Sequence, residues 1–160
     1  MNAKDIIRAT INMGQFVCNA YLADLSDADL MRRAAPGVNH INWQWGHLIA
    51  SEFYHGNITC GGKMPPLPAG FAEKYSKETA NCDDPSAFCS KEELARVAAE
   101  QRAATLAVLD AIPEADLGQE TGIPYCPTKG EQLALQGNHW LMHCGQWAVV
   151  RRQLGKAPLF

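Results

Sequence analysis

The chain lacks the features that mark a membrane or secreted protein. No segment approaches the roughly 18 consecutive apolar residues of a membrane-spanning helix, and the N-terminal residues show no apolar stretch followed by a small-residue cleavage site. These absences predict a cytoplasmic protein with no membrane partner. With 160 residues the chain has the length of one ordinary domain, so we expect a single domain over residues 1–160.

An excess of basic residues is also missing. The 14 lysines and arginines are outnumbered by 17 acidic residues, which gives a formal net charge of −3. Such a balance provides no basic surface for nucleic acid or anionic lipid. We therefore expect no nucleic-acid partner.

The six cysteines form no Cys-x-x-Cys pair, and an even count in a chain of this length is weak evidence for a disulfide framework. Free thiols are the main interpretation for all six. A bridge among those in polar or Gly/Pro-rich connections, or a reactive thiol beside a metal, stays open as an alternative. These connections carry Cys60, Cys82, Cys89 and Cys126, whereas Cys18 and Cys144 fall within apolar helical patterns.

The alternation of apolar and polar residues that indicates a β-strand is absent, and helical periodicity predicts an all-α protein. We expect long helices over about residues 4–24, 40–56, 91–112 and 128–154, which together form a four-helix bundle. Asn39 is the expected N-cap of the second of these helices, and Ser90 and Thr128 begin capping boxes for the last two.

Between residues 57 and 89, glycines and prolines interrupt the helical pattern. The sequence therefore predicts a long irregular connection between the second and third long helices. A connection of this length is uncommon in a compact domain, so it can be a lid or pocket wall, with a mobile surface crossover as the alternative.

Two histidines, His139 and His143, stand four residues apart in the segment GNHWLMHCGQW. On a helix with about 100° per residue they lie about 40° apart, so both imidazoles can reach one metal ion. The spacing alone is common, and hydrogen-bonded core or surface histidines explain most of its occurrences. A metal site therefore requires a third ligand from elsewhere in the chain.

That third ligand is expected to be His47, in the middle of the second predicted helix. It follows Gly46, where a neighbouring element can approach closely. His40 lies seven residues earlier on nearly the same helix face and is a competing candidate, whereas His55 is rotated by about 80°. Glu52 is rotated by about 140° from His47, so we interpret it as a buried or interface carboxylate rather than a ligand.

The segments NHINWQWGHLIASE and GNHWLMHCGQWAVVRRQLGKAP resemble the DinB/YfiT-like superfamily of bacterial four-helix metal-binding proteins. The resemblance covers essentially the whole chain in helix order and spacing. Its most specific part is the single histidine of the second helix combined with HxxxHxGQ and RRxLGKxP on the last helix. It implies a DinB-like domain that forms a homodimer, with His47, His139 and His143 as the metal-binding triad.

Better characterised members of that superfamily are metal-dependent transferases or isomerases that act with low-molecular-weight thiols such as mycothiol or bacillithiol. The resemblance thus implies first a thiol-dependent transferase acting on a small molecule. A metal-dependent hydrolase and a non-catalytic metal-binding or interaction module are the alternatives. Imidazole ligands suit zinc, nickel, copper or iron, and among these divalent ions we expect zinc or nickel first.

Several neighbours of the histidines are candidates for supporting roles. Gln136 and Gln146 lie one turn from the pair and can orient ligands through their amides, although ordinary helix packing is the favoured interpretation of each one alone. Tyr54, Trp43 and Trp140 can line a pocket beside the site, or belong to the core. For the homodimer, the first and third long helices are the surfaces that we expect to be involved.

Overall fold

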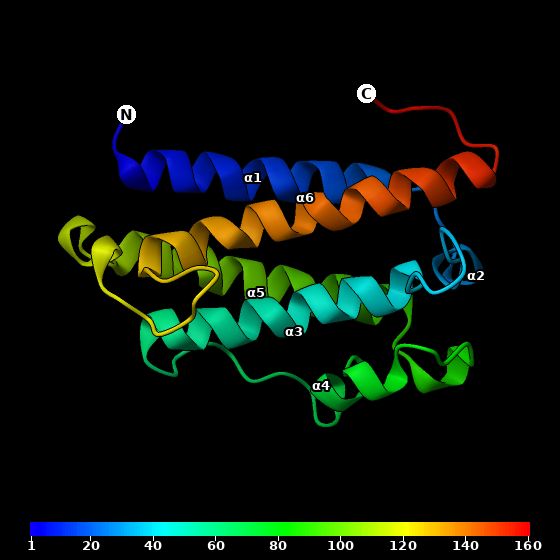
Figure 1. Ribbon diagram of the computed structural model, residues 1–160, viewed down its shortest axis with the longest axis horizontal. Coiled ribbons are helices and arrows are strands. Elements are labelled where there is room, and N and C mark those ends of the chain that lie inside the picture. The colour runs from blue at the N-terminus through cyan, green and yellow to red at the C-terminus, as the bar shows by residue number, and fades with distance from the viewer.

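The structure, a computed structural model that describes all 160 residues, consists of six α-helices and three short 3-10 helices (Figure 1). Only an isolated bridge between Glu120 and Thr128 has β character. The all-α class predicted from the sequence is confirmed. The elements are α1 (Ala3–Leu22), α2 (Asp27–Leu30), α3 (Ile41–Cys60), α4 (Phe71–Lys74), η1 (Lys77–Thr79), η2 (Pro85–Ala87), α5 (Lys91–Ala111), η3 (Glu114–Gly118) and α6 (Lys129–Gln153).

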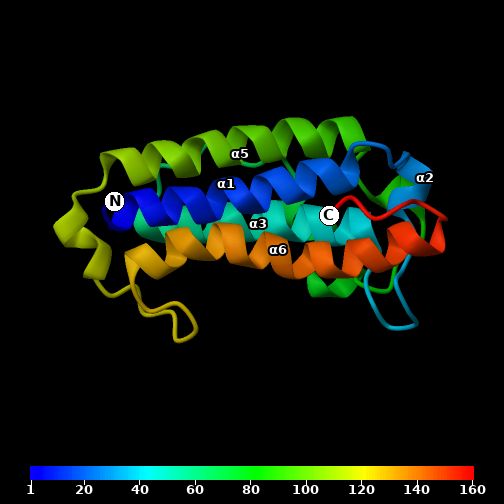
Figure 2. The ribbon, with the colours of Figure 1, turned by 90° about the horizontal axis from the view of Figure 1, so that it is seen from above.

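The four long helices α1, α3, α5 and α6 pack together along their lengths. Helix α1 contacts α6 and α5, and α3 contacts the same two helices from the other side, as Figure 2 shows from above. The apolar faces of all four meet in a core that includes Leu22, Leu48, Leu94 and Trp147. None of these helices combines the length and apolarity that crossing a membrane requires.

Two glycines bring the backbones of helices α1 and α6 into direct contact. A Cβ atom on Gly137 would lie 2.2 Å from the carbonyl oxygen of Thr10, and one on Gly14 would lie 2.7 Å from the carbonyl oxygen of Gly137. Only hydrogen side chains allow the two backbones to meet in this way. The contact holds α6 immediately before its two histidines, His139 and His143.

The N-cap residues agree with the predictions for α5 and α6 but not for α3. Thr128 forms the complete capping box with Glu131. At Ser90 only half of the predicted box is present, because its side chain accepts a hydrogen bond from Glu93 N but the Glu93 side chain does not accept one from the backbone of Ser90. The expected N-cap of α3, Asn39, is wrong, because His40 takes this position one residue later. An imidazole nitrogen replaces the usual amide or hydroxyl oxygen as the acceptor, which the standard capping preferences do not anticipate.

His40 is fully buried, and both of its ring nitrogens are engaged. Nδ1 accepts a hydrogen bond from the backbone nitrogen of Trp43 at 3.0 Å, and Nε2 donates to the carbonyl oxygen of Cys82 at 3.2 Å. Burial, with a smaller contribution from the Arg33 cation, lowers the pKa of His40 to about 4. Protonation of Nδ1 would remove the cap of α3.

This arrangement predicts that His40 makes the protein less stable in acid. The unfolded chain has a His pKa of about 6.5, so it binds the proton first as the pH falls. The contribution of neutral His40 to the free energy of unfolding is present above about pH 6.5 and is lost as the pH falls toward 4. We expect urea unfolding to show that the free energy of unfolding of the wild type, relative to that of His40→Asn, is lower at pH 4.5 than at pH 7.5 by on the order of 2 kcal/mol. Parallel pH profiles of the two proteins would contradict the assignment.

The long irregular connection between the second and third long helices is confirmed, and it carries only α4, η1 and η2. Phe71, Tyr75 and Phe88 from this connection are buried and join the main core. The ring of Tyr75 occupies the space beside Gly46, where a Cβ atom would lie 2.3 Å from it. The close approach predicted at Gly46 is therefore confirmed, and the connection packs against the α3 side of the core.

All six cysteines are free thiols, as the main interpretation of the sequence predicted. Cys18 on α1 and Cys144 on α6 are buried with their Sγ atoms 3.0 Å apart. Their mutual contact, together with burial, raises the pKa of Cys18 far above its ordinary value. The pair acts as a small apolar contact between α1 and α6.

Candidate metal centre

Three histidines from two helices meet on one side of the bundle. His47 lies on α3, and His139 and His143 lie on α6, one turn apart. One ring nitrogen from each can be chosen so that all three atoms lie within 4.8 Å of one another. The structure thus brings together the three residues predicted from the sequence, in a cluster that could hold a metal ion. His40, the competing candidate, is engaged in capping α3.

A glutamine sets the proton position on His143. Nδ1 of His143 lies 2.8 Å from Oε1 of Gln44, and the indole nitrogen of Trp147 donates to the same oxygen at 2.9 Å. An indole N–H can only donate, so the Gln44 atom that faces both partners is the carbonyl oxygen. His143 therefore donates from Nδ1 and keeps the lone pair of Nε2 for an ion.

The three imidazoles are neutral in this environment. Burial is the main cause, and it lowers the pKa of His139 to about 3 and that of His143 to about 4, with neighbouring imidazoles adding to the effect. Burial also lowers the pKa of His47. Trp43 stacks on His47 with ring centroids 5.1 Å apart and planes inclined by 7°. Neutral, oriented imidazoles fit a divalent metal ion, because binding has no proton to displace.

A cavity of about 430 Å³ opens beside the cluster. Its lining contains no Asp, Glu, Lys or Arg side chain. The residues around it are His47, Ser51, His55, Tyr125, Leu135, Asn138, His139 and Met142. An ion held by the three histidines would therefore be accessible to a small molecule in this cavity.

No residue of the connection between α3 and α5 lines this cavity, so the connection does not form a wall of the pocket beside the histidines. Its residues Gly61 and Lys63 line a different cavity, at the C-terminal end of α3. The segment just before α6 lines the pocket beside the histidines instead, through Tyr125. The two segments pack against different parts of α3. The connection after α3 turns back along this helix and places Tyr75 next to Gly46, whereas the loop before α6 lies near the C-terminal half of α3 (Figure 1).

The side-chain amides of Gln136 and Gln146, which are candidates for supporting the site, form no hydrogen bond with the histidines. Gln136 donates from Nε2 to the carbonyl oxygen of Gln132 within its own helix, and the side chain of Gln146 makes no hydrogen bond. Gln44 supports the histidines instead. It precedes His47 by three residues, a spacing that places both side chains on the same face of α3 and that the sequence already contained.

Two of the three predicted aromatic residues, Trp43 and Trp140, belong to the core, which is the alternative that the sequence left open. Trp43 stacks on His47 from outside the cavity, Tyr54 is 53% exposed, and Trp140 packs under the guanidinium of Arg102 at 4.8 Å. The aromatic side chain that does line the cavity is Tyr125. It comes from an irregular segment, where periodicity gives no indication of side-chain direction.

We predict that Gln44→Leu weakens zinc binding about 10–100-fold, because outer partners of ligating histidines have effects of this size. The variant loses the acceptor for Nδ1 of His143 and frees the ring to rotate. Competition with a chromogenic zinc chelator measures the change. Gln146→Leu is the matched control and should bind zinc like the wild type. Equal affinities of Gln44→Leu and the wild type would show that Gln44 does not orient His143.

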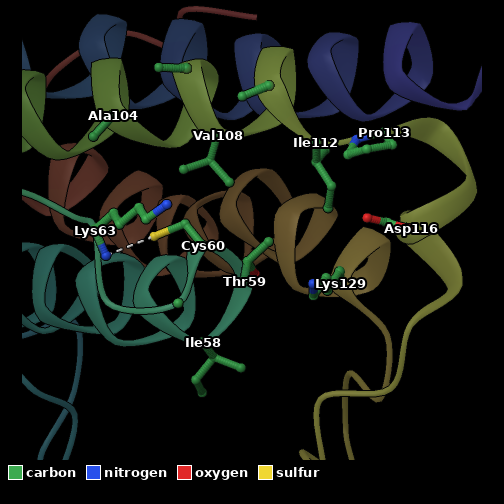
Figure 3. Close-up of a pocket in the computed structure, with 13 residues that line it drawn as sticks. Ile58, Thr59, Cys60, Lys63, Ala104, Val108, Ile112, Pro113, Asp116 and Lys129 are labelled. Atoms are coloured by element: carbon green, nitrogen blue, oxygen red, sulfur yellow. Dashed lines mark hydrogen bonds between the residues drawn. The ribbon is translucent and has the colours of Figure 1, made fainter.

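A larger cavity, about 690 Å³, lies between the C-terminal ends of α3 and α5 (Figure 3). Its walls are mostly alanines and aliphatic side chains, with Lys63, Asp116 and Lys129 around them. It contains no histidine, and its one thiol, Cys60, accepts a hydrogen bond from the backbone nitrogen of Lys63 at 3.2 Å. Size alone therefore does not identify the functional site, and the histidine cluster has the more specific chemistry.

The fold and the site together define a class of protein: an all-α protein with a three-histidine cluster between its second and fourth long helices. The chain belongs to the DinB superfamily, whose family model matches residues 17–147. It is similar to the crystal structure described as the conserved protein of locus from Enterococcus faecalis, with a TM-score of 0.71 and 18% identity over 98% of this chain and 99% of that one. None of the curated proteins matches the sequence.

Proposed function

We propose that this protein is a divalent-metal-dependent transferase that acts on a small thiol. The observation that carries the proposal is the neutral three-histidine cluster facing a cavity of about 430 Å³. This volume lies within the range of about 300–1,000 Å³ that is usual for small-molecule sites. The histidines His47, His139 and His143 would hold the ion, with zinc or nickel expected first.

The cavity favours a substrate that becomes an anion beside the histidines. When bound, a divalent ion supplies a positive charge that lowers the pKa of a nearby thiol. Three neutral imidazoles leave that charge uncompensated, and no carboxylate lines the cavity. Ser51, Tyr125 and Asn138 offer polar contacts, while Leu135 and Met142 offer apolar ones. The lining thus suits a compact thiol with a polar body.

The same lining gives less support to the alternatives. A hydrolase of the metalloprotease kind needs a carboxylate base beside the ion, and Glu52, the one acid on α3, forms an ion pair with Arg102 instead. A purely structural site is usually closed by four protein ligands. The cluster here consists of three residues, and two of them line the cavity.

The first experiment is elemental analysis of untagged protein purified without chelator or added metal, for wild type and His47→Ala together. We expect near one metal ion per wild-type chain and little in the variant. The second step measures transfer of 2-mercaptoethanol to 1-chloro-2,4-dinitrobenzene, in which a C–S bond forms and chloride leaves. Metal-dependent transfer, lost in His47→Ala, supports the proposal. Absence of metal in both proteins, even after reconstitution with zinc or nickel, would overturn it.

We also propose that the protein forms a homodimer through α1. Three large apolar side chains on this helix, Ile6, Met13 and Phe16, are more than half exposed, whereas α5 has none of this kind. The exposed apolar side chains therefore favour α1 over α5, the third long helix, as the dimer interface. Light scattering should give twice the chain mass for wild type and the chain mass for Phe16→Glu. A monomeric wild type at micromolar concentration would rule this dimer out.

A further inference from the structure

A tyrosine and a histidine meet on the cavity wall outside the three-histidine cluster. The hydroxyl of Tyr125 lies 3.0 Å from Nε2 of His55, although 70 positions separate them in the chain. His55 is 4% exposed, while Tyr125 is 69% exposed. Both side chains line the cavity that His47 and His139 also line.

The hydrogen-bond partners of His55 determine which atom carries its proton. Nδ1 lies 2.8 Å from the backbone carbonyl oxygen of Ser51, which can only accept. Nδ1 therefore carries the hydrogen, and burial lowers the pKa of His55, so the ring is neutral. Nε2 then has a free lone pair, and the hydroxyl of Tyr125 donates to it.

The loop that carries Tyr125 is fixed from both sides. Thr121 donates its backbone N–H to the carbonyl oxygen of Pro127 at 2.7 Å. The side-chain amide of Gln132 on α6 donates to the hydroxyl of Thr121 at 2.9 Å and to the carbonyl oxygen of Cys126 at 3.3 Å. Cys126, next to Tyr125, is buried. The position of the phenol is thus set by the fold despite its exposure.

The pair adjoins the histidine cluster through Ser51. The hydroxyl of Ser51 lies 3.2 Å from Nδ1 of His55 and 3.5 Å from Nδ1 of His139. Apart from His55 and the histidine cluster, the cavity lining contains no imidazole, and it contains no carboxylate. His55, reached through Tyr125, is therefore the proton acceptor that the cavity offers to a substrate.

We propose that Tyr125 and His55 together accept the proton of the substrate thiol. The S–H proton passes to the phenol oxygen of Tyr125 while the phenol proton passes to Nε2 of His55. The step leaves a thiolate, a neutral tyrosine and a His55 imidazolium whose Nδ1–H is held by the carbonyl of Ser51. This inference rests on the proposed function, because it takes a thiol as the substrate.

The first test observes the hydrogen bond itself in the metal-free protein. In ¹⁵N NMR spectra of histidine-labelled protein, Nδ1 of His55 should be protonated and Nε2 should be an acceptor. Tyr125→Phe should shift the Nε2 resonance, whereas Tyr54→Phe, which removes an exposed phenol next to His55, should leave it in place. A proton on Nε2 of His55 would overturn the pair whatever the substrate is.

The second test follows ligand binding by the cobalt(II)-loaded protein in stopped-flow absorption at pH 7. With 2-mercaptoethanol as the probe, Tyr125→Phe should slow binding about 100-fold, at the lower end of general acid–base effects, while the final amplitude stays the same. Azide, an anion with no proton to lose, should bind both proteins at equal rates. Tyr54→Phe should behave like the wild type with both probes.

The outcomes separate the two proposals. Equal thiol-binding rates for wild type and Tyr125→Phe would overturn the proton-accepting role and leave the thiol transferase standing. Slower binding of both thiol and azide would show that Tyr125 shapes access to the cavity, which also overturns that role. Binding of azide but not of thiol by the wild type would overturn the thiol substrate, and the proton step with it.

Discussion

Replacing His143 by alanine is expected to abolish stoichiometric binding of a divalent metal ion. Removal of one of three protein ligands should lower the affinity by more than the roughly 10–100-fold that the loss of an outer partner causes. Alanine has the highest helix propensity, so α6 should keep its helical structure. We expect near one zinc per wild-type chain and almost none in His143→Ala after dialysis against a weak chelator, with similar far-ultraviolet circular dichroism.

His40→Asn is the matched control for this experiment. His40 is also a buried histidine, but it caps α3 and lies outside the cluster. This variant should retain its metal, which would show that loss of metal does not follow from replacing any buried imidazole. Full occupancy in His143→Ala would remove His143 from the ligands.

The largest loss of stability is expected for Arg102→Ala. Arg102 on α5 lies 3.0 Å from a carboxylate oxygen of Glu52 on α3, and both side chains are almost completely buried. Arg102 also donates to the carbonyl oxygen of Gln136 at 3.0 Å and stacks over Trp140. The predicted burial of Glu52 is thereby confirmed, with Arg102 as the partner that the sequence did not identify.

Removing Arg102 alone would leave the Glu52 carboxylate buried without a counter-charge. Burial already raises the pKa of Glu52 despite the guanidinium beside it, which shows how costly its ionised form is. We expect Arg102→Ala to lower the free energy of unfolding by about 3–5 kcal/mol, the usual effect of breaking a buried pair from one side. Urea unfolding of the metal-free protein at pH 7 measures it.

The double variant Glu52→Leu with Arg102→Met provides the comparison. Replacing both partners by apolar side chains of similar length removes the uncompensated charge, so most of the lost stability should return. A double variant as unstable as Arg102→Ala would mean that the contacts of Arg102 with Gln136 and Trp140, rather than the ion pair, hold α5 in place.

Much of the architecture could be predicted from the sequence because it depends on neighbours along the chain. Helical periodicity, the caps at Ser90 and Thr128, and the i, i+4 spacing of His139 and His143 are local features, and the structure contains all of them. The end of α3 was less predictable. Helix α3 continues to Cys60, four residues beyond its expected end, where Gly61 takes a left-handed conformation with φ of 68°.

What only the tertiary structure decided concerns residues from different helices. His47 rather than His40 faces the α6 pair because His40 turns back to cap its own helix. Gln44 reaches His143 across 99 positions, and Tyr125 reaches His55 across 70. Such contacts depend on the rotation and crossing of packed helices, which the close contact of Gly14 with Gly137 helps to set. The sequence by itself determined the helices and the candidate ligands, and packing determined which side chains orient them and which line the cavity.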